Sequence, residues 1–323
     1  MTDAENEGPD LAALFGASEA KTFLGLEACP KPADVSAPIA LLGVPCASPY
    51  RSVGAYCRNA PHALRQATAS LTANLHHHDF DLGGKIFPDD SQPAVDCGDL
   101  PYDEADAPGN RETIRQAVAS LIERGAVPLV VGGDDSVPIP MLQAFDGQGD
   151  FTILQLDAHI DWRDEHMGER YGLSSNMRRA SEMGHIKDIV QVGARGIGSA
   201  RHQDVQDALD WGVSFVTAEQ VHGQGVAPAI DKIPEGRPVI ICIDVDGLDP
   251  NCVPGVIGRA PGGLSYYQAV DLIRGAAERG PIAAMNFVEF MPERDVDGIG
   301  ALTVARLMIT AMGIVARQKA SKN

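Results

Sequence analysis

Residues 151–161 read FTILQLDAHID, an apolar run that leads directly into Asp157, His159 and Asp161. Apolar residues on consecutive positions are typical of a strand in a parallel sheet, because helices cover both of its faces. Asp157, His159 and Asp161 alternate, so an extended chain would point all three to one side. The stretch therefore predicts a buried parallel strand with a cluster of potential metal ligands at its carboxyl end.

Two further apolar runs end in acidic residues. Residues 128–131 lead into GGDDS (132–136), and residues 238–243 lead into DVDGLDP (244–250). Because ligands of open parallel sheets bind beyond the carboxyl ends of the strands, we expect the three clusters to converge on one crevice. Several carboxylates buried together are costly unless cations neutralise them. Carboxylate oxygens with a single imidazole suit Mn, Fe, Co, Ni or Zn.

Each cluster also has a structural interpretation. The sequence GGDDS is a common turn and helix cap, and Asp, Gly and Pro in DVDGLDP are turn residues. Asp134 and Asp249 could each hold a loop through bonds from the backbone to the side chain. Three such strand ends in one chain nevertheless favour a metal site over three separate turns.

The rest of the chain alternates between short apolar runs and helical patterns. Further strands are expected at 39–44, 94–97, 189–192, 214–216 and 282–287. Helices are expected at 61–75, 112–124, 137–144, 199–211, 266–279 and 301–317, with Ser265 as an N-cap. This alternation predicts a single α/β domain over residues 38–323, with three α/β/α layers and a mainly parallel sheet of about eight strands. Residues 1–37, rich in Ala, Pro and acidic residues, are expected to form an arm or a peripheral helix.

Composition narrows the classes of partner. Among 323 residues, 44 are acidic and 26 basic, giving a net charge of −18. This charge argues against nucleic acid or an anionic membrane as the main partner, since both require a cationic face. No apolar run is expected to reach the roughly 18–20 residues of a membrane span, and the first ten residues lack the pattern of a secretion signal. The six scattered cysteines, without a CxxC pair, are expected to be reduced thiols of a cytoplasmic protein.

Several motifs resemble the ureohydrolases, the arginase and agmatinase family, and in particular its agmatinase-like branch. Besides DAHxD and DxDxxDP, they are LGVP (42–45), DLGG (81–84), DCGD (96–99), PGGL (261–264) and VEFMP (288–292). The resemblance extends from about residue 38 to the end of the chain and implies an arginase-like fold. It also implies a binuclear metal centre, most commonly of Mn²⁺, with Ni²⁺ known in the family.

The resemblance assigns roles residue by residue. Asp157 and Asp244 would bridge the two ions, Asp135 and Asp161 would complete one site, and His159 and Asp246 the other. A metal-bridging hydroxide would attack the guanidinium carbon of a guanidino compound, releasing urea or a substituted urea and an amine. The residues expected to bind the substrate are Glu289, which would hold the guanidinium, and Trp162, Ser174 and Ser175. Homotrimers or homohexamers are implied, and hetero-oligomers with a paralogue are a further option.

Two positions depart from the family pattern. Asp135 stands where histidine is usual, so five aspartates against two dications leave the centre one unit more negative. Such a centre should bind metal at least as strongly but acidify its water less. Leu173 replaces the histidine that helps to protonate the leaving amine. Proton delivery would then fall to His166, Glu165, Tyr171 or solvent, with Asp161 and Glu289 as the other catalytic groups.

These departures leave more than one function open. The first is a metal-dependent hydrolase of a guanidino compound other than arginine. The second is a catalytically weak paralogue that supports an active ureohydrolase in a hetero-oligomer. A third, a deacetylase-like enzyme with a mononuclear zinc site, fits poorly because the sequence lacks a histidine pair near the acidic motifs.

Overall fold

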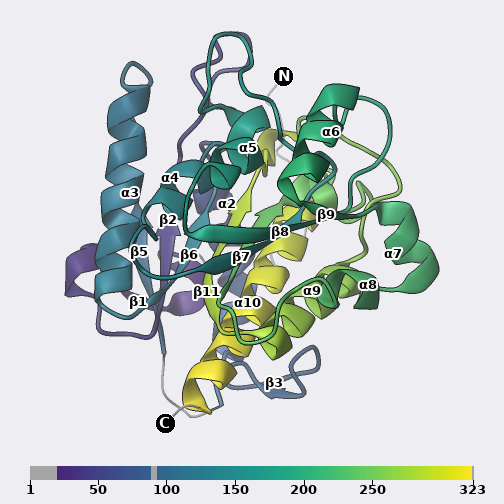
Figure 1. Cartoon of the computed structure of the whole chain (residues 1–323). Coiled ribbons are helices and arrows are strands. Elements are labelled where there is room, and N and C mark those ends of the chain that lie inside the picture. Colours follow the sequence, from purple (N-terminus) through teal and green to yellow (C-terminus); the bar gives the residue numbers. More distant parts are fainter. Residues whose placement is uncertain (1–19, 89–92, 322–323) are drawn as a thin grey trace, which may run out of the picture.

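The computed structural model describes residues 20–88 and 93–321. Nine parallel strands form one sheet in the order β1-β5-β2-β6-β11-β10-β7-β8-β9 (Figure 1). Their bounds are β1 Glu27–Ala28, β2 Ile39–Gly43, β5 Ala94–Asp99, β6 Val127–Val131, β7 Phe151–Leu156, β8 Ile186–Val192, β9 Ser214–Val216, β10 Val239–Asp244 and β11 Ile282–Val288. The short strands β3 (His78–Asp79) and β4 (Gly84–Lys85) form a separate antiparallel pair.

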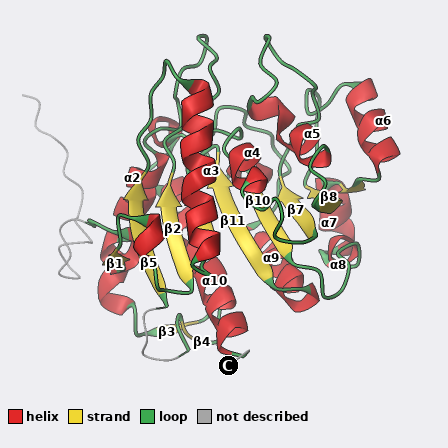
Figure 2. Ribbon diagram, turned by 60° about the vertical axis from the view of Figure 1, so that its left-hand side comes forward, coloured by secondary structure: helices red, strands yellow, loops and turns green. Residues whose placement is uncertain are grey.

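Helices cover both faces of the sheet, giving three layers (Figure 2). One face packs against α3 Ala107–Glu123, α4 Pro138–Gln143, α5 Asn176–Ser181 and α6 His202–Trp211. The other packs against α2 Ala60–Ala67, α7 Ala218–Gln224, α8 Ala227–Ile230, α9 Tyr266–Arg279 and α10 Ile299–Ala320. Short 3₁₀ helices occur at η1 Phe23–Gly25, η2 Pro32–Asp34, η3 Ala69–Asn74, η4 Leu173–Ser175, η5 Val245–Gly247 and η6 Pro292–Arg294.

Successive residues of one strand belong to different cores. Leu41 and Leu129 belong to the core that contains α9 and α10, whereas their neighbours Leu42 and Val130 belong to the core that contains α3. Side chains of a strand alternate between the two faces, and here both faces are covered. This explains why the strands appear in the sequence as unbroken apolar runs.

The predicted α/β/α architecture is confirmed, with one strand more than expected. The additional strand, β1, lies at the edge of the sheet and pairs Glu27 with Val95. It belongs to the segment expected to be an arm or a peripheral helix, of which residues 20–37 supply η1, β1 and η2, and Phe23 and Leu24 are buried. Residues 1–19 of that segment lie outside the described residues. The N-cap at Ser265 is confirmed, because its Oγ accepts a bond from the backbone N–H of Gln268.

The last helix, α10, is long and apolar enough to cross a membrane by length and composition, so the expectation that the chain contains no such run is wrong. Most of its apolar stretch is buried, and it packs against α9 and α2. A helix that is apolar on nearly all sides is also what the covered face of a large sheet requires. In this structure α10 is a core helix.

The strands that carry the acidic motifs are neighbours. The order β6-β11-β10-β7 places the carboxyl ends of these central strands side by side. Figure 2 shows the arrows of these strands running in one direction, so the loops that follow them gather at the same end. The candidate site lies at these carboxyl ends.

Candidate metal centre

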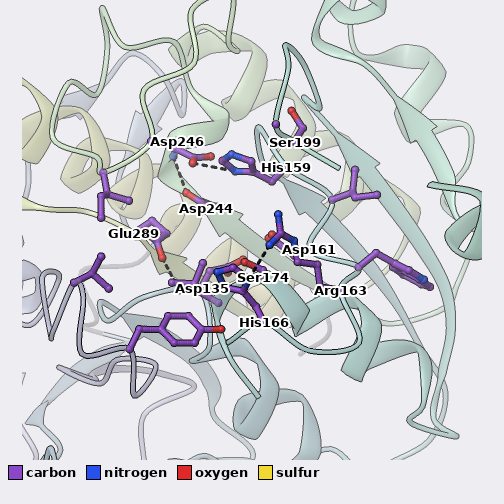
Figure 3. Close-up of a pocket in the computed structure, with 18 of the residues that line it drawn as sticks. Asp135, His159, Asp161, Arg163, His166, Ser174, Ser199, Asp244, Asp246 and Glu289 are labelled. Carbon is purple, nitrogen blue, oxygen red and sulfur yellow. Dashed lines mark hydrogen bonds and ion pairs between the residues drawn. The ribbon is translucent and has the colours of Figure 1, made fainter. Parts of the chain in front are cut away.

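Four adjacent loops contribute the charged residues of the candidate site. Asp135 follows β6, Asp157 follows β7, Asp244 ends β10, and Glu289 follows β11. Asp246 lies in η5, directly after β10. Figure 3 shows Asp135, Asp244, Asp246 and Glu289 around one cavity. The convergence of the three acidic motifs, expected from the sequence, is therefore what the fold produces.

The potential ligands form two groups that share a residue. One atom each from Asp157, His159, Asp244 and Asp246 lies within 4.8 Å of the others, and the same holds for Asp135, Asp157 and Asp161. The spacing brings ligand atoms close enough to surround two ions with Asp157 between them. Carboxylate oxygens with one imidazole are a suitable donor set for first-row dications such as Mn²⁺ and Ni²⁺.

The electrostatics of the cluster call for positive charge. Burial, and then the charges of neighbouring aspartates, raise the pKa values of Asp135, Asp161 and Asp244 well above the usual range. Unpaired carboxylates buried in contact would otherwise repel one another. Divalent cations among these oxygens would offset both the cost of burying the carboxylates and their mutual repulsion.

His159 shows where such a cation would lie. Its Nδ1 is 3.3 Å from Oδ1 of Asp157 and 3.2 Å from Oδ2 of Asp246. Burial disfavours the charged ring, but the bonds to both aspartates outweigh it and raise the pKa of His159 to about 12. Burial also acts to raise the pKa of Asp157, yet the bonds from His159 lower it. The imidazolium proton thus occupies a position suited to a metal ion, and the residues fit a binuclear centre.

Two site residues have strained backbones. Asp161 has φ +44° and Glu289 has φ +68°, the left-handed region that side chains rarely adopt. Such a residue costs on the order of 1–3 kcal/mol, and strain of this kind concentrates at functional sites. Gly133 has φ +73°, and a Cβ there would be 2.6 Å from the carbonyl oxygen of Cys46. Its own carbonyl accepts from the backbone N–H of Glu289 at 3.0 Å, so the loops after β6 and β11 are joined.

Glu289 is buried and held by two neighbours. Its two oxygens lie 2.8 and 2.7 Å from the hydroxyl of Tyr56, which donates to them, and Oε1 accepts from the backbone N–H of Asp135 at 2.8 Å. Burial first, and then the charge of Asp134, raise the pKa of Glu289 to about 8. A cationic partner would favour the ionised form. The site therefore offers a pre-positioned carboxylate to a guanidinium.

A cavity of about 310 Å³ lies above the cluster. Trp162 and Ser174, expected to bind substrate, line it, whereas Ser175 is not among its described lining residues. Ser175 is buried, and its hydroxyl has no hydrogen-bond partner in the described part of the chain. Trp162 also belongs to the core, where it packs edge-on against Trp211 with ring centroids 6.1 Å apart.

Of the side chains considered for proton delivery, His166 lines the cavity, as does Leu173. Glu165 and Tyr171 are not among its lining residues in the described chain. Burial, followed by the charges of Arg163 and Arg201, lowers the pKa of His166. The charged form of this ring is thereby disfavoured.

Asp134 and Asp249, ambiguous in the sequence, stabilise loops. Asp134 accepts from the backbone N–H of Ser48 and from the hydroxyl of Ser136, both at 2.6 Å. Asp249 accepts from the backbone N–H of Gly262 at 2.8 Å. Both therefore have the structural role that side-chain-to-backbone bonding predicts.

Several supporting residues were not found from the sequence. Tyr56 holds Glu289, Asn176 donates to Oδ2 of Asp135, and Nε2 of Gln155 donates to Asp157 at 2.7 Å. Arg195 donates to the carbonyl oxygens of Asp246, Gly247 and Leu248 and so fixes the loop after β10. Gln155 alone left a signal, as a polar residue inside an apolar strand.

A parallel α/β sheet with two groups of potential metal ligands at the carboxyl ends of its strands is the arrangement that the motifs predicted for a ureohydrolase. Residues 37–313 match the Arginase family. The chain belongs to this family and is a ureohydrolase, a hydrolase that acts on linear amidines. The resemblance inferred from the motifs is thereby confirmed.

Individual relatives differ in substrate. The mitochondrial agmatinase of Gallus gallus is 31% identical over 234 residues, covering 71% of this chain and 68% of that protein. The N(1)-aminopropylagmatine ureohydrolase of Thermus thermophilus is 32% identical over 218 residues, covering 67% and 71%. The structure of proclavaminate amidino hydrolase from Streptomyces clavuligerus superposes with a TM-score of 0.82 at 26% identity, covering 94% of this chain and 99% of that one.

Proposed function

We propose that this protein hydrolyses a guanidino compound other than arginine, giving urea or a substituted urea and an amine. The observation that carries the proposal is the placement of Glu289 in the same cavity as the two ligand groups. The cavity thus offers metal ligands and, beside them, an anion suited to a guanidinium. The altered loop at Leu173 argues for a substrate different from arginine.

The ligand groups suggest how two ions would be held. Asp135, Asp157, Asp161 and Asp244 would hold one, and Asp157, His159, Asp244 and Asp246 the other. Bound there, two dications would lower the pKa of a water molecule and orient it as the nucleophile. The oxygen-rich donor set favours Mn²⁺, with Ni²⁺ as the alternative.

Residues of the chain orient the substrate and move protons. Glu289 would pair with two N–H groups of the guanidinium, a strong and directional interaction. This holds the guanidinium carbon towards the ligand groups. Asp161 would accept a proton from the attacking water, and His166 would relay that proton to the leaving amine. Overall the oxygen of water bonds to the carbon, the C–N bond to the amine breaks, and the amine leaves protonated.

Urea release tests the proposal. Protein loaded with Mn²⁺, or in parallel with Ni²⁺, is incubated with a panel of guanidino acids, guanidino amines and arginine. We expect urea or a substituted urea from at least one compound other than arginine. Its release should fall roughly 100-fold in Glu289→Gln and stay unchanged in Glu278→Gln, an exposed position on α9. Metal-loaded protein that hydrolyses none of them would contradict the proposal.

The second candidate is a catalytically weak subunit that supports an active paralogue. It is favoured by Asp135, whose carboxylate pairs with Asn176, and by Leu173, which lines the cavity where the family has a histidine. Elemental analysis separates the two functions. A supporting subunit should purify with little metal and gain activity only when co-expressed with a partner, whereas the enzyme should bind metal and turn over alone.

A further inference from the structure

The cavity contains one cationic side chain that the chemistry described so far does not use. Among the described residues that line it, Arg163 is the single arginine or lysine. It lies two residues beyond Asp161, in the loop after β7. In Figure 3, Arg163 and Glu289 project from different sides of the cavity.

The lining carboxylates all have other partners. Asp135, Asp161, Asp244 and Asp246 belong to the ligand groups, and Glu289 is bound by Tyr56 and by the backbone N–H of Asp135. The remaining one, Asp204, is paired with Arg201 at 2.6 Å. Within residues 20–88 and 93–321, Arg163 itself makes no ion pair. Its charge is thus left uncompensated in a half-buried position.

The local contacts orient Arg163 without neutralising it. Its backbone N–H donates to the carbonyl oxygen of Ser174 at 3.1 Å, which fixes the loop. Its Nη1 lies 2.8 Å from Nδ1 of His166. Because a guanidinium can only donate, Nδ1 of His166 accepts this bond. The other N–H groups of Arg163, and the hydroxyl of Ser174, have no hydrogen-bond partner in the described part of the chain.

We propose that Arg163 binds a carboxylate at the end of the substrate remote from the guanidinium, so that the substrates are guanidino carboxylic acids. This inference rests on the proposed function. An arginine can grip a carboxylate with two parallel bonds, and a second cation in the same place would be repelled. A substrate with a cationic amine at its far end would meet that repulsion, whereas a guanidino acid places opposite charges at both ends of the cavity.

Ser174 extends the same donor set. It lines the cavity beside Arg163, to which it is joined through the backbone. Its free hydroxyl can donate to the second oxygen or the second lone pair of the carboxylate. The remaining N–H groups of this guanidinium and the hydroxyl of Ser174 make an anion-binding end opposite the cation-binding end at Glu289.

A matched pair of substrates tests the inference. 5-Guanidinopentanoate and agmatine have the same chain length and differ in the charge of the remote group. We expect kcat/KM of the metal-loaded protein to favour the acid by at least about tenfold. Arg163→Gln should raise KM for the acid by about tenfold or more with a smaller change in kcat, and should not raise KM for agmatine. Arg163→Lys should retain part of the preference.

Arg170→Gln is the control, because Arg170 lies in the same loop, is exposed and pairs with Asp164 outside the cavity. It should leave the preference unchanged. If the wild type prefers agmatine, and Arg163→Gln does not change the ratio of kcat/KM for the two compounds, the inference is overturned and the proposed function still stands.

Calorimetry supplies a readout independent of turnover. The metal-loaded protein is titrated with 5-guanidinopentanoate and with agmatine. If no guanidino compound releases urea, the proposed function fails. Acid binding that weakens about tenfold or more in Arg163→Gln would still support a carboxylate site, whereas equal binding of both compounds by both proteins would overturn it.

Discussion

Several independent contacts and a strained backbone fix the position of Glu289. It is buried, strained at φ +68°, and held by Tyr56 and by the backbone of Asp135. The strain and the bonds together fix one orientation of its carboxylate. A group fixed in this way needs no reorganisation when a guanidinium arrives.

Replacing Glu289 with glutamine should lower kcat/KM by roughly 100-fold, the typical effect of losing one partner of a buried hydrogen-bonded charge pair. The metal content should stay the same, because Glu289 is not in either ligand group. Steady-state kinetics with elemental analysis of the same sample measure both. Tyr56→Phe, which removes only the bond that orients the carboxylate, should cost about tenfold. Unchanged kcat/KM in Glu289→Gln would contradict the role of this residue.

Asp135→His restores the residue that the family usually has at this position. The centre becomes one unit less negative, so its water should be more acidic. We expect the pH at which kcat/KM rises to its plateau to move down by about one unit. The measurement is the pH dependence of kcat/KM at saturating metal. A profile that moves upward would show that the additional aspartate does not suppress water ionisation.

At this scale the sequence predicted the groups that carry charge and missed most of those that orient them. Asp157, His159 and Asp161 were found because they lie in one short motif after a recognisable strand. Tyr56 is 233 residues from Glu289, and Arg195 is 51 residues from Asp246. Such contacts depend on how distant segments are brought together, and no local pattern encodes them.

Between elements, the buried ion pair of α2 and β5 is the clearest anchor. Arg65 is 6% exposed, and its Nε and Nη2 donate to Asp96 at 2.7 and 2.9 Å. Asp96 also accepts from the backbone N–H of Phe23, so the same carboxylate holds η1. One carboxylate therefore ties α2 and η1 to the sheet.

Arg65→Met should lower the free energy of unfolding by about 3–5 kcal/mol, because Asp96 is left as an uncompensated buried charge. Chemical denaturation monitored by circular dichroism measures the change. Arg115→Met removes the exposed pair with Glu112 and should cost less than about 1 kcal/mol. Equal effects of the two substitutions would contradict the anchoring role of Arg65.

The lengths of the elements explain which of them the sequence predicted. Strands and helices with long apolar periodicity, such as β7, α9 and α10, were expected close to their observed bounds. The short elements β1, α5, α7 and α8 were not expected. A strand of two residues has no periodicity to detect, and a helix of four to seven residues gives at most two turns. Tertiary contacts, here the edge of β5 for β1, determine such elements.

For the whole molecule, the metal centre couples stability to pH. In the metal-free fold the pKa values of Asp135, Asp161 and Asp244 are raised, and that of Glu289 is raised to about 8. A raised pKa means that the folded state binds more protons than the unfolded state, whose acids titrate near about 4. Stability therefore falls as pH rises through this window. His159, with its raised pKa, acts in the same direction above about pH 6.5.

The metal-free protein, kept in chelator, should accordingly melt at a lower temperature at pH 8 than at pH 5.5. With saturating Mn²⁺ the trend should reverse, because the ligands must lose their protons to bind metal. Thermal melts followed by circular dichroism across this range measure both slopes. If the melting temperature changed with pH in the same direction with and without metal, the assignment of these carboxylates as ligands would be contradicted.

We propose that two dications among the buried aspartates and His159 allow these side chains to lie together. Anomalous diffraction from crystals grown with Mn²⁺ tests it most directly. We expect two anomalous peaks roughly 3.5–4 Å apart, with Asp157 between them. A single peak, or none among these side chains in metal-saturated crystals, would contradict it.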